Sequence, residues 1–405
     1  MLYDAYQAQQ DMLAPLRAGA DLTRAAFGDT SAGPTANYWF RTLAAGAEIV
    51  FRSQLIHDRP AYDIAPVMVD GVPVNVTEEV ALEMPFGNLV HFRKDTATRQ
   101  PRVLLAAPMA GHFATLLRNT VQTLLIDHDV YITDWKSARD VPLSAGRFGT
   151  DEYIDTLMAF FSHIGPGAHG VAVCQPCPSM LATMALMAED DHPATPRSLT
   201  LMAGPVDTSI NPTRVNLLAQ EHPFSWFEEN LITTVPRRYA GAHRRVYPGF
   251  LQLSAFITMN ISRHIRAHMD LFGHIMKGEI EKADANRRFY DEYFSVADLA
   301  AEFYLDTVRK VFQEQHLPRG IYTWRDRKVD PRAIRKASLL TVEGERDDIC
   351  GLGQTLAAQD LLSSLKPFRK KHYVQAGVGH YGVFSGRRWQ NQIYPVVRNM
   401  IFASD

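Results

Sequence analysis

The chain has 405 residues and a formal net charge of −2, with 46% hydrophobic and 21% charged residues, which is typical of a globular protein. The near balance of 42 basic and 44 acidic residues excludes a polycationic nucleic-acid binder and an acidic disordered tail. Three cysteines cannot form a disulfide framework, so we expect a reducing cytoplasmic setting, and no apolar run approaches the ~20 residues of a membrane span.

The first sixty residues predict two helices. Apolar residues recur at helical spacing between Leu2 and Leu16 and again between Trp39 and Phe51, and the segment 29–34 between them is typical of a break. The two helices either pack on the core, which we favour, or form an arm that binds a partner or a surface. We assign residues 1–64 to an N-terminal helical extension.

A β-rich segment and a series of buried strands follow. Residues 66–92 are rich in β-forming residues and contain the hairpin signal Asp70-Gly71, so we expect an antiparallel edge before the main sheet. The later apolar runs are too continuous for strands with one exposed face, which indicates buried parallel strands in an α/β sheet. These runs are 103–107, 130–133, 170–174, 198–203, 338–343 and 372–375.

The alternation of strands and helices stops between residues 205 and 330. This segment has 17 aromatic residues among 126, a richer share than the 10% of the whole chain. We expect a helical cap, residues 205–330, over the carboxyl ends of the strands, which would divide the α/β core into residues 65–204 and 331–405. The alternative is that these aromatic residues form a hydrophobic core within the inserted segment and do not contact a substrate. The substrate-contacting candidates are Phe224, Trp226, Phe227 and Tyr247.

Cys174 is the strongest candidate for a nucleophile. It stands where a buried strand runs into a helix that begins with Pro176 and Pro178, and the free N–H groups of a helix N-terminus favour a thiolate. A strand-to-helix turn is the position of a nucleophile elbow, and the sequence contains no G-x-S-x-G serine. A buried structural cysteine, or a C-x-x-C dithiol formed with Cys177, is the alternative.

Two later strand ends supply an acid and a base. Asp347 follows the strand 338–343, and His380 stands in a glycine-rich loop after the last strand. The chain order of nucleophile, acid and base is that of α/β-hydrolases. Asp207 and Asp348 compete with Asp347 for the role of the acid, which would orient the imidazole and stabilise its charge.

Two backbone N–H groups are predicted to hold the oxyanion. One belongs to Gln175, directly after the nucleophile, and the other to Met109, in the loop after the first core strand. Pro108 in that loop has no N–H to donate. His112 is either a polar residue of the site or the start of a helix.

These residues resemble those of the intracellular polyhydroxyalkanoate depolymerases, also called polyhydroxybutyrate depolymerases. The resemblance covers nearly the whole chain and implies an α/β-hydrolase whose catalytic triad is Cys174, Asp347 and His380; Cys177 matches no catalytic position. The related polyhydroxyalkanoate synthases carry Gly-x-Cys-x-Gly where this chain has Ala172 and Pro176, which favours a depolymerase. The segments that carry the resemblance are 104–118 (LLAAPMAGHFATLLR), 127–135 (DHDVYITDW), 173–176 (VCQP) and 377–386 (GVGHYGVFSG).

The resemblance implies hydrolysis of the ester bonds of intracellular polyhydroxybutyrate through an acyl-enzyme, with release of 3-hydroxybutyrate or oligomers. It implies no metal and no organic cofactor. The expected partner is the polymer or its granule surface in the cytoplasm, not a nucleic acid, and a homo-oligomer is compatible with the sequence. The alternatives are a synthase-like acyltransferase and a C-x-x-C dithiol redox or granule-binding protein.

Overall fold

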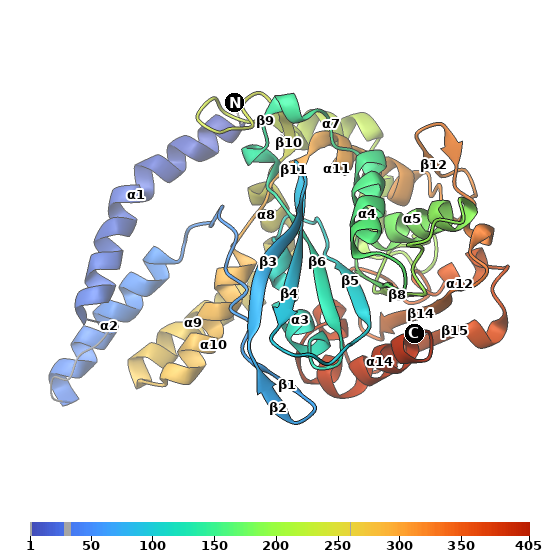
Figure 1. The fold of residues 1–405 in the computed structure, drawn as a ribbon. Coiled ribbons are helices and arrows are strands. Elements are labelled where there is room, and N and C mark those ends of the chain that lie inside the picture. The colour runs from blue at the N-terminus through green and yellow to red at the C-terminus, as the bar shows by residue number, and fades with distance from the viewer. Residues whose placement is uncertain (1, 28–33, 260) are drawn as a thin grey trace.

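The computed structural model describes residues 2–27, 34–259 and 261–405, and an eight-stranded sheet forms its centre (Figure 1). The strand order is β15-β14-β8-β7-β5-β6-β4-β3. β4 runs antiparallel to both of its neighbours, and β6, β5, β7, β8, β14 and β15 run parallel to one another. The strands are β3 (Val76–Glu83), β4 (Gly87–Lys94), β5 (Arg102–Ala106), β6 (Asp129–Trp135), β7 (His169–Val173), β8 (Ser198–Met202), β14 (Ser338–Gly344) and β15 (Lys370–Gln375).

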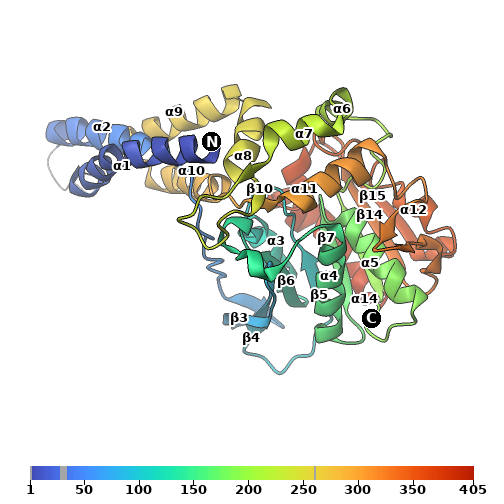
Figure 2. The same ribbon diagram turned by 90° about the horizontal axis from the view of Figure 1, so that it is seen from above.

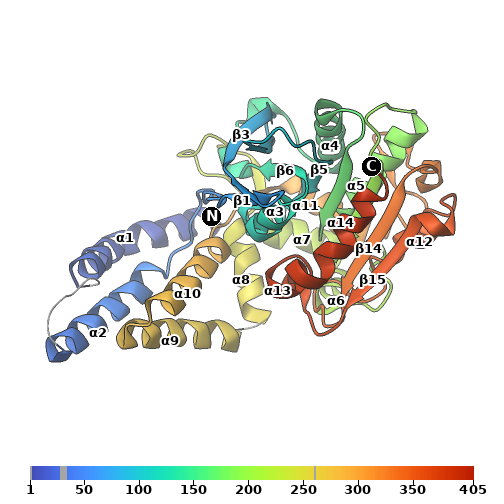
Figure 3. The same ribbon diagram turned by 60° about the horizontal axis from the view of Figure 1, so that its bottom comes forward.

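Helices cover both faces of this sheet. α4 (Thr150–Ile164) and α5 (Cys177–Glu189) pack on one face, and α3 (Arg118–Leu124) and α14 (Tyr394–Phe402) pack on the other (Figures 1 and 3). A mostly parallel sheet between two helical layers, with its reversed strand second from the edge, is the α/β-hydrolase fold. The predicted fold class is confirmed.

The burial of the central strands explains why their sequences could be recognised. Every residue of β7, β8 and β14 is buried, because helices remove water from both faces of these strands. The six predicted core strands are confirmed with small changes at their ends. The predicted hairpin at Asp70-Gly71 is confirmed as β1 (Val67–Val69) and β2 (Val72–Val74), and both turn residues have positive φ, 51° and 81°. That hairpin is a sheet of its own, while β3 and β4 form the antiparallel edge of the main sheet.

A long insertion separates β8 from β14. Besides helices it contains the small sheet β11-β10-β9 and the hairpin β12-β13, which the sequence did not indicate. Its helices are α6 (Arg214–Glu221), α7 (Phe224–Leu231), α8 (Gly249–Met259), α9 (Ile261–Lys277), α10 (Ile280–Tyr293) and α11 (Ala301–Thr307). Its strands are β9 (Thr233–Thr234), β10 (Arg245–Tyr247), β11 (Leu299–Ala300), β12 (Thr323–Trp324) and β13 (Arg327–Lys328). The short helices α12 (Ala358–Leu361) and α13 (Gly386–Arg388) follow in the second part of the core.

The two N-terminal helices form an arm with part of the insertion. α1 (Leu2–Phe27) packs against α2 (Pro34–Phe51), and α2 packs against α9 (Figures 1 and 2). The start of α1 meets the core, where Tyr3 is buried with its ring 5.4 Å from that of Phe250. Farther along, Met12 and Trp39 are 74% and 66% exposed, so the favoured expectation of helices packed on the core is wrong for most of the arm. Most of the predicted break at 29–34 lies outside the described residues.

A helix that crosses a bilayer must be both long and apolar. Among the described residues, every helix is too short or too polar to span a membrane.

Candidate active site

The candidate site lies where the chain changes direction across the sheet. β5 stands between β6, which follows it in the chain, and β7, so the connections on its two sides diverge. In parallel α/β sheets such a switch point opens a crevice at the carboxyl ends of the strands. The loops that follow β5 and β7 meet there, because the backbone N–H of Met109 donates a hydrogen bond to the side-chain Oε1 of Gln175 at 3.2 Å.

Cys174 occupies a strained turn between β7 and α5. Its φ of 65° lies in the left-handed region, which costs a residue with a Cβ roughly 1–3 kcal/mol. Its N–H donates to the carbonyl oxygen of Met202 at 2.8 Å, and its own carbonyl accepts the N–H of Cys177 at 3.1 Å. These bonds hold the turn, and the side chain of Cys174 stays partly accessible.

Gly204 allows the end of β8 to pack closely under this turn. A Cβ at this position would lie 2.2 Å from the Sγ of Cys177, closer than non-bonded atoms approach. Only a residue without a side chain fits there without displacing the start of α5.

Asp347 and His380 form a buried pair at the carboxyl ends of β14 and β15. Asp347 Oδ2 lies 2.8 Å from His380 Nδ1, and their side chains are 1% and 5% exposed. The second oxygen, Oδ1, accepts the backbone N–H groups of Ile349 at 2.9 Å and Cys350 at 2.8 Å. The carboxylate is therefore fixed by its own loop and directed at the imidazole.

The two neighbours of His380 raise the pKa of its imidazole. Burial by itself lowers the pKa of the imidazole, but the negative charges of Cys174 and Asp347 and their hydrogen bonds outweigh burial, so the pKa of His380 is raised well above its ordinary value. Because Nδ1 faces Asp347, the other ring nitrogen, Nε2, is the one that can form a hydrogen bond with Cys174. A thiolate beside an imidazolium is a nucleophile with a proton donor next to it.

Glu343 holds the loop that carries Asp347. Its carboxylate is buried at the end of β14 and accepts the backbone N–H groups of Gly353, Thr355 and Leu356 at 2.8–3.1 Å. The hydroxyl of Thr355 in turn accepts the N–H of Gly204 at 2.8 Å. The Glu343 carboxylate is therefore connected, through Thr355, to Gly204 at the strand end beneath Cys174.

The competing acids form no hydrogen bond to the imidazole among the described residues. Asp207 accepts both the N–H and the hydroxyl of Ser209, at 3.0 and 2.6 Å, in a local turn. Asp348 is exposed. Of the three acids, the hydrogen bond to His380 is made by Asp347.

Cys177 has the environment of a structural thiol. It is fully buried, and its Sγ donates to the carbonyl oxygen of Ala172 at 3.4 Å. Burial raises the pKa of this thiol well above its ordinary value, which disfavours the thiolate that a dithiol exchange needs.

Three of the four predicted substrate aromatics pack in a small cluster within the insertion, whereas Tyr247 belongs to the main hydrophobic core. Phe224, Trp226 and Phe227 belong to a small cluster with residues of α11 and the helix after it, and the Trp226 ring stacks on His222 at 4.1 Å. The Tyr247 ring packs against Tyr304 at 4.0 Å.

Other aromatic residues lie beside His380. The rings of Tyr381 and Phe384 lie 5.9 and 5.7 Å from that of His380. Tyr381 also packs against the cluster of α8 and α10 that contains Tyr293, and the Tyr293 ring lies 5.3 Å from that of His112. The sequence singled out His112 as a possible polar site residue, but nothing in it indicated Tyr293, which meets the site only through tertiary packing.

The paired histidines of α9 have structural contacts. His264 Nδ1 bonds the hydroxyl of Tyr290 at 3.0 Å, and His268 Nδ1 bonds the carbonyl of His264 at 2.8 Å. Within the described ranges there is no group of three His, Cys, Asp or Glu side chains that could hold a metal ion.

Comparison with known proteins gives one family match. The family model described as PHB de-polymerase C-terminus matches residues 203–405, a segment that includes Asp347 and His380. No curated protein sequence matches the chain.

Several solved structures are similar at low identity. They include a monoacylglycerol lipase from Paleococcus ferrophilus (12% identity, TM-score 0.43, 82% of this chain and 100% of that one). They also include the 2-hydroxy-6-oxo-6-phenylhexa-2,4-dienoate hydrolase of Rhodococcus sp. strain RHA1 (13%, 0.42, 81% and 99%). A third is the alpha/beta hydrolase GrgF from Penicillium sp. sh18 (10%, 0.45, 82% and 99%).

Proposed function

The chain belongs to the polyhydroxybutyrate (PHB) depolymerase family, and from this premise we propose that it hydrolyses the ester bonds of polyhydroxybutyrate or a close polyhydroxyalkanoate. The observation that carries the proposal is the convergence of Cys174, His380 and Asp347 at the carboxyl edge of one sheet. A strained, partly accessible cysteine beside an imidazolium suits attack on an ester carbonyl.

In the first step the Cys174 thiolate attacks the carbonyl carbon of the polymer. A C–S bond forms, and the carbonyl electron pair moves to oxygen to give a tetrahedral oxyanion. When the intermediate collapses, the ester C–O bond breaks, and His380 transfers its Nε2 proton to the departing alkoxide. One polymer fragment leaves as an alcohol, and the other remains as a thioester on Cys174.

The backbone N–H groups of Gln175 and Met109 would stabilise the oxyanion. The Met109 N–H already donates to a carbonyl-type oxygen, Oε1 of the Gln175 side chain, so it is directed at an acceptor in the crevice. An entering ester carbonyl would replace that amide oxygen. Preorganised donors of this kind contribute about 3–4 kcal/mol each to lowering the barrier.

In the second step water hydrolyses the thioester. Neutral His380 accepts a proton from water as the oxygen attacks the thioester carbon, and the C–S bond then breaks to regenerate the thiolate and the imidazolium. Asp347 stabilises the positive ring and fixes its orientation through both steps. The products are 3-hydroxybutyrate or short oligomers, and every group in the mechanism belongs to the chain or is water.

The insertion would serve as the cap over this site, with residues 205–330 between the two parts of the core. Tyr293 from the insertion lies against His112 of the oxyanion loop, which supports a position near the reacting atoms. An apolar groove suits an uncharged polyester. The outer part of this groove would contain Phe224, Trp226, Phe227 and Tyr247. These residues would contact the stretch of polymer that extends beyond the catalytic centre.

The polymer is insoluble, so the enzyme would act at the granule surface inside the cytoplasm. The test is incubation of the purified protein with amorphous polyhydroxybutyrate granules, followed by measurement of acid release and product mass. We expect 3-hydroxybutyrate or its oligomers from the wild type and none from Cys174→Ala. Chain extension from a hydroxyacyl thioester of coenzyme A, with no acid release from granules, would instead identify an acyltransferase.

A further inference from the structure

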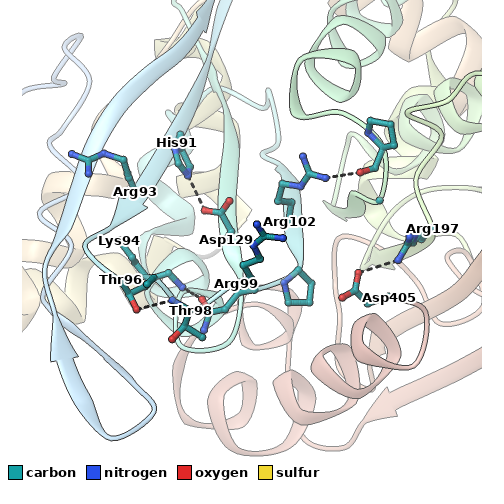
Figure 4. A pocket seen from close by; sticks show the side chains of 15 residues that line it. His91, Arg93, Lys94, Thr96, Thr98, Arg99, Arg102, Asp129, Arg197 and Asp405 are labelled. Carbon is teal, nitrogen blue, oxygen red and sulfur yellow. Dashed lines mark hydrogen bonds and ion pairs between the residues drawn. The ribbon is translucent and has the colours of Figure 1, made fainter.

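A second cavity lies at the edge of the sheet opposite Cys174. Its wall includes the first residues of β5 and β6, the turn before β7 and the residue before β8, which all stand at the amino ends of parallel strands. The connection from β4 to β5, residues 95–101, closes one side (Figure 4). Its volume of about 620 Å³ falls in the range of small-molecule sites.

Positive charge dominates this cavity. Five Lys and Arg side chains line it against two carboxylates, those of Asp129 and Asp405, on a chain whose net charge is −2. Both carboxylates are already engaged, Asp129 with His91 at 2.7 Å and Asp405 with Arg197 at 3.2 Å. The five cations are Arg93, Lys94, Arg99, Arg102 and Arg197.

Two of these cations are fixed in place by neutral oxygens. Arg102 donates to the carbonyls of Ile164, at the end of α4, and of Pro166. Lys94 donates to the carbonyls of Leu125 and His128 at 2.6 and 2.7 Å. These contacts hold both side chains in place and neutralise neither charge. Within the described residues, Arg102 uses two of its five N–H donors.

The cavity also brings two guanidinium groups together. A Cβ on Gly167, whose φ is 90°, would lie 3.7 Å from Cζ of Arg197 and 3.8 Å from Nη2 of Arg102. Arg99 extends into the middle of the cavity between them and Asp129 (Figure 4), and in the part of the chain that the structure describes neither Arg99 nor Arg102 forms an ion pair. Both guanidinium groups therefore lie beside Gly167, and an anion placed between them would relieve the repulsion of their like charges.

We propose that this cavity binds a small anion carrying two or more phosphate groups. The planar fork of an arginine matches phosphate oxygens in pairs, and here three arginines line one cavity: Arg99 from the β4–β5 connection, Arg102 from the start of β5 and Arg197 from the residue before β8. A single phosphate would leave at least one of these charges unmatched, whereas a diphosphate or triphosphate spans them. Inorganic polyphosphate and a nucleotide present the same groups and differ in whether a base is attached.

The test measures binding directly by titration calorimetry at low ionic strength, with pyrophosphate, tripolyphosphate and adenosine triphosphate as separate probes. We expect saturable binding of at least one of them. Arg99→Gln should weaken it by about tenfold or more, and Arg99→Gln combined with Arg197→Gln by about 100-fold. A nucleotide that binds more than tenfold tighter than tripolyphosphate would identify a nucleotide as the source of the phosphates; equal affinity would identify the inorganic anion.

Arg245→Gln is the matched control. Arg245 is exposed, as Arg99 and Arg197 are, and it pairs with Glu228 as Arg197 pairs with Asp405, but it lies in the insertion. It should bind as the wild type does, and all variants should keep the wild-type unfolding temperature and the ester hydrolysis that depends on Cys174. The proposal fails if none of the three probes binds saturably up to millimolar concentration, or if Arg99→Gln and Arg245→Gln weaken binding equally. It also fails if only long oligonucleotides bind, since that would indicate a nucleic-acid surface. None of these readouts depends on the polymer, so the proposed hydrolase function is judged separately.

Discussion

At the scale of single residues, the site depends on a cysteine in a backbone conformation that side chains avoid. A glycine would adopt the φ of Cys174 without strain, so the presence of a cysteine there costs folding free energy. The hydrogen bonds to Met202 and Cys177, and the space left by Gly204, offset this cost. Strain of this kind at a strand-to-helix turn directs a side chain out of the sheet, toward a substrate.

Replacement of Cys174 by alanine should abolish ester hydrolysis while the fold persists. The reaction loses its nucleophile, so we expect kcat on granules to fall by about 10⁴-fold or more, with an unchanged circular dichroism spectrum. Cys177→Ala is the control. It removes a buried sulfur, so it should lower stability by about 1–2 kcal/mol and leave kcat within about threefold. Near-native turnover by folded Cys174→Ala would remove the whole mechanism.

Asp347 should control how hydrolysis depends on alkaline pH. The pKa of His380 is raised by the charges of Cys174 and Asp347, so the imidazolium that protonates the leaving alkoxide persists well above pH 6.5 and is lost as pH rises through the raised value. Asp347→Asn removes one of these charges. We expect the alkaline limb of the pH–rate profile to move to lower pH by about one unit or more, and kcat to fall about 10²–10⁴-fold.

The neighbouring variant Asp348→Asn is the matched comparison, because that carboxylate is exposed and one position away. Its profile should coincide with the wild-type profile. If Asp348→Asn shifts the alkaline limb and Asp347→Asn leaves it in place, the acid has been assigned to the wrong residue.

At the scale of elements, we expect Glu343 to hold the loop that carries Asp347 in place. Its carboxylate accepts three backbone N–H groups from the loop, and Glu343→Gln replaces the charged acceptor with a neutral amide. We expect a loss of about 1.5–3 kcal/mol of unfolding free energy in urea and a fall in kcat, because Asp347 loses its fixed position. Glu83→Gln, an exposed carboxylate paired with Lys136, should change neither measurement.

The insertion can be tested by comparing two substrates. Trp226 is partly buried and stacks on His222, so Trp226→Ala removes a large apolar surface from the proposed outer groove. We expect kcat/KM on polymer to fall about tenfold or more and kcat/KM on a small soluble ester to stay within about twofold, because only the polymer extends beyond the catalytic centre. Equal losses on both substrates, together with a lowered unfolding temperature, would indicate that the aromatic cluster is only a core of the insertion. No loss on either substrate would contradict the cap.

The sequence predicts an element when the residues that determine it lie close together in the chain. The core strands could be predicted because burial on both faces requires a continuous apolar run, and the turn at Cys174 because Pro176 and Pro178 mark a helix start. The sequence ranks Asp347 first among the candidate acids, but the geometry of the loop decides which carboxylate meets His380, and no local pattern specifies that geometry. The contact of Tyr293 with His112 joins positions 181 residues apart, and no local pattern carries it.

At the scale of the whole molecule, the structure assigns different environments to its parts. The carboxyl edge of the sheet holds Cys174, His380 and Asp347, and the amino edge holds the cationic cavity. The helical arm projects from this body (Figure 2). Large apolar side chains such as Met12, Leu16, Leu22 and Trp39 are exposed along it. Few of its residues contact the sheet, so its order depends on contacts among its own helices.

Glu48 should therefore hold the arm together. It is 1% exposed, and its carboxylate meets Arg24 of α1 at 3.6 Å, Arg287 of α10 at 3.0 Å and Arg52, so it joins three segments of the chain. Glu48→Gln leaves these guanidinium groups without their shared carboxylate. Removal of one partner from an isolated buried pair costs roughly 3–5 kcal/mol, and we expect a smaller loss here, because each arginine keeps a second carboxylate nearby.

Hydrogen exchange followed by mass spectrometry measures this effect locally. Amides of α1 and α2 should exchange about tenfold faster or more in Glu48→Gln than in the wild type, since each 1.4 kcal/mol of opening free energy is a factor of ten, while β7 and α5 keep their protection. Glu281→Gln, an exposed carboxylate on α10, should leave the arm unchanged. If exchange in Glu48→Gln rose equally in β7 and in α1, the carboxylate would stabilise the whole fold and the arm would not be an independent unit. Unchanged exchange in α1 would mean that apolar contacts between α1 and α2 are sufficient to hold it.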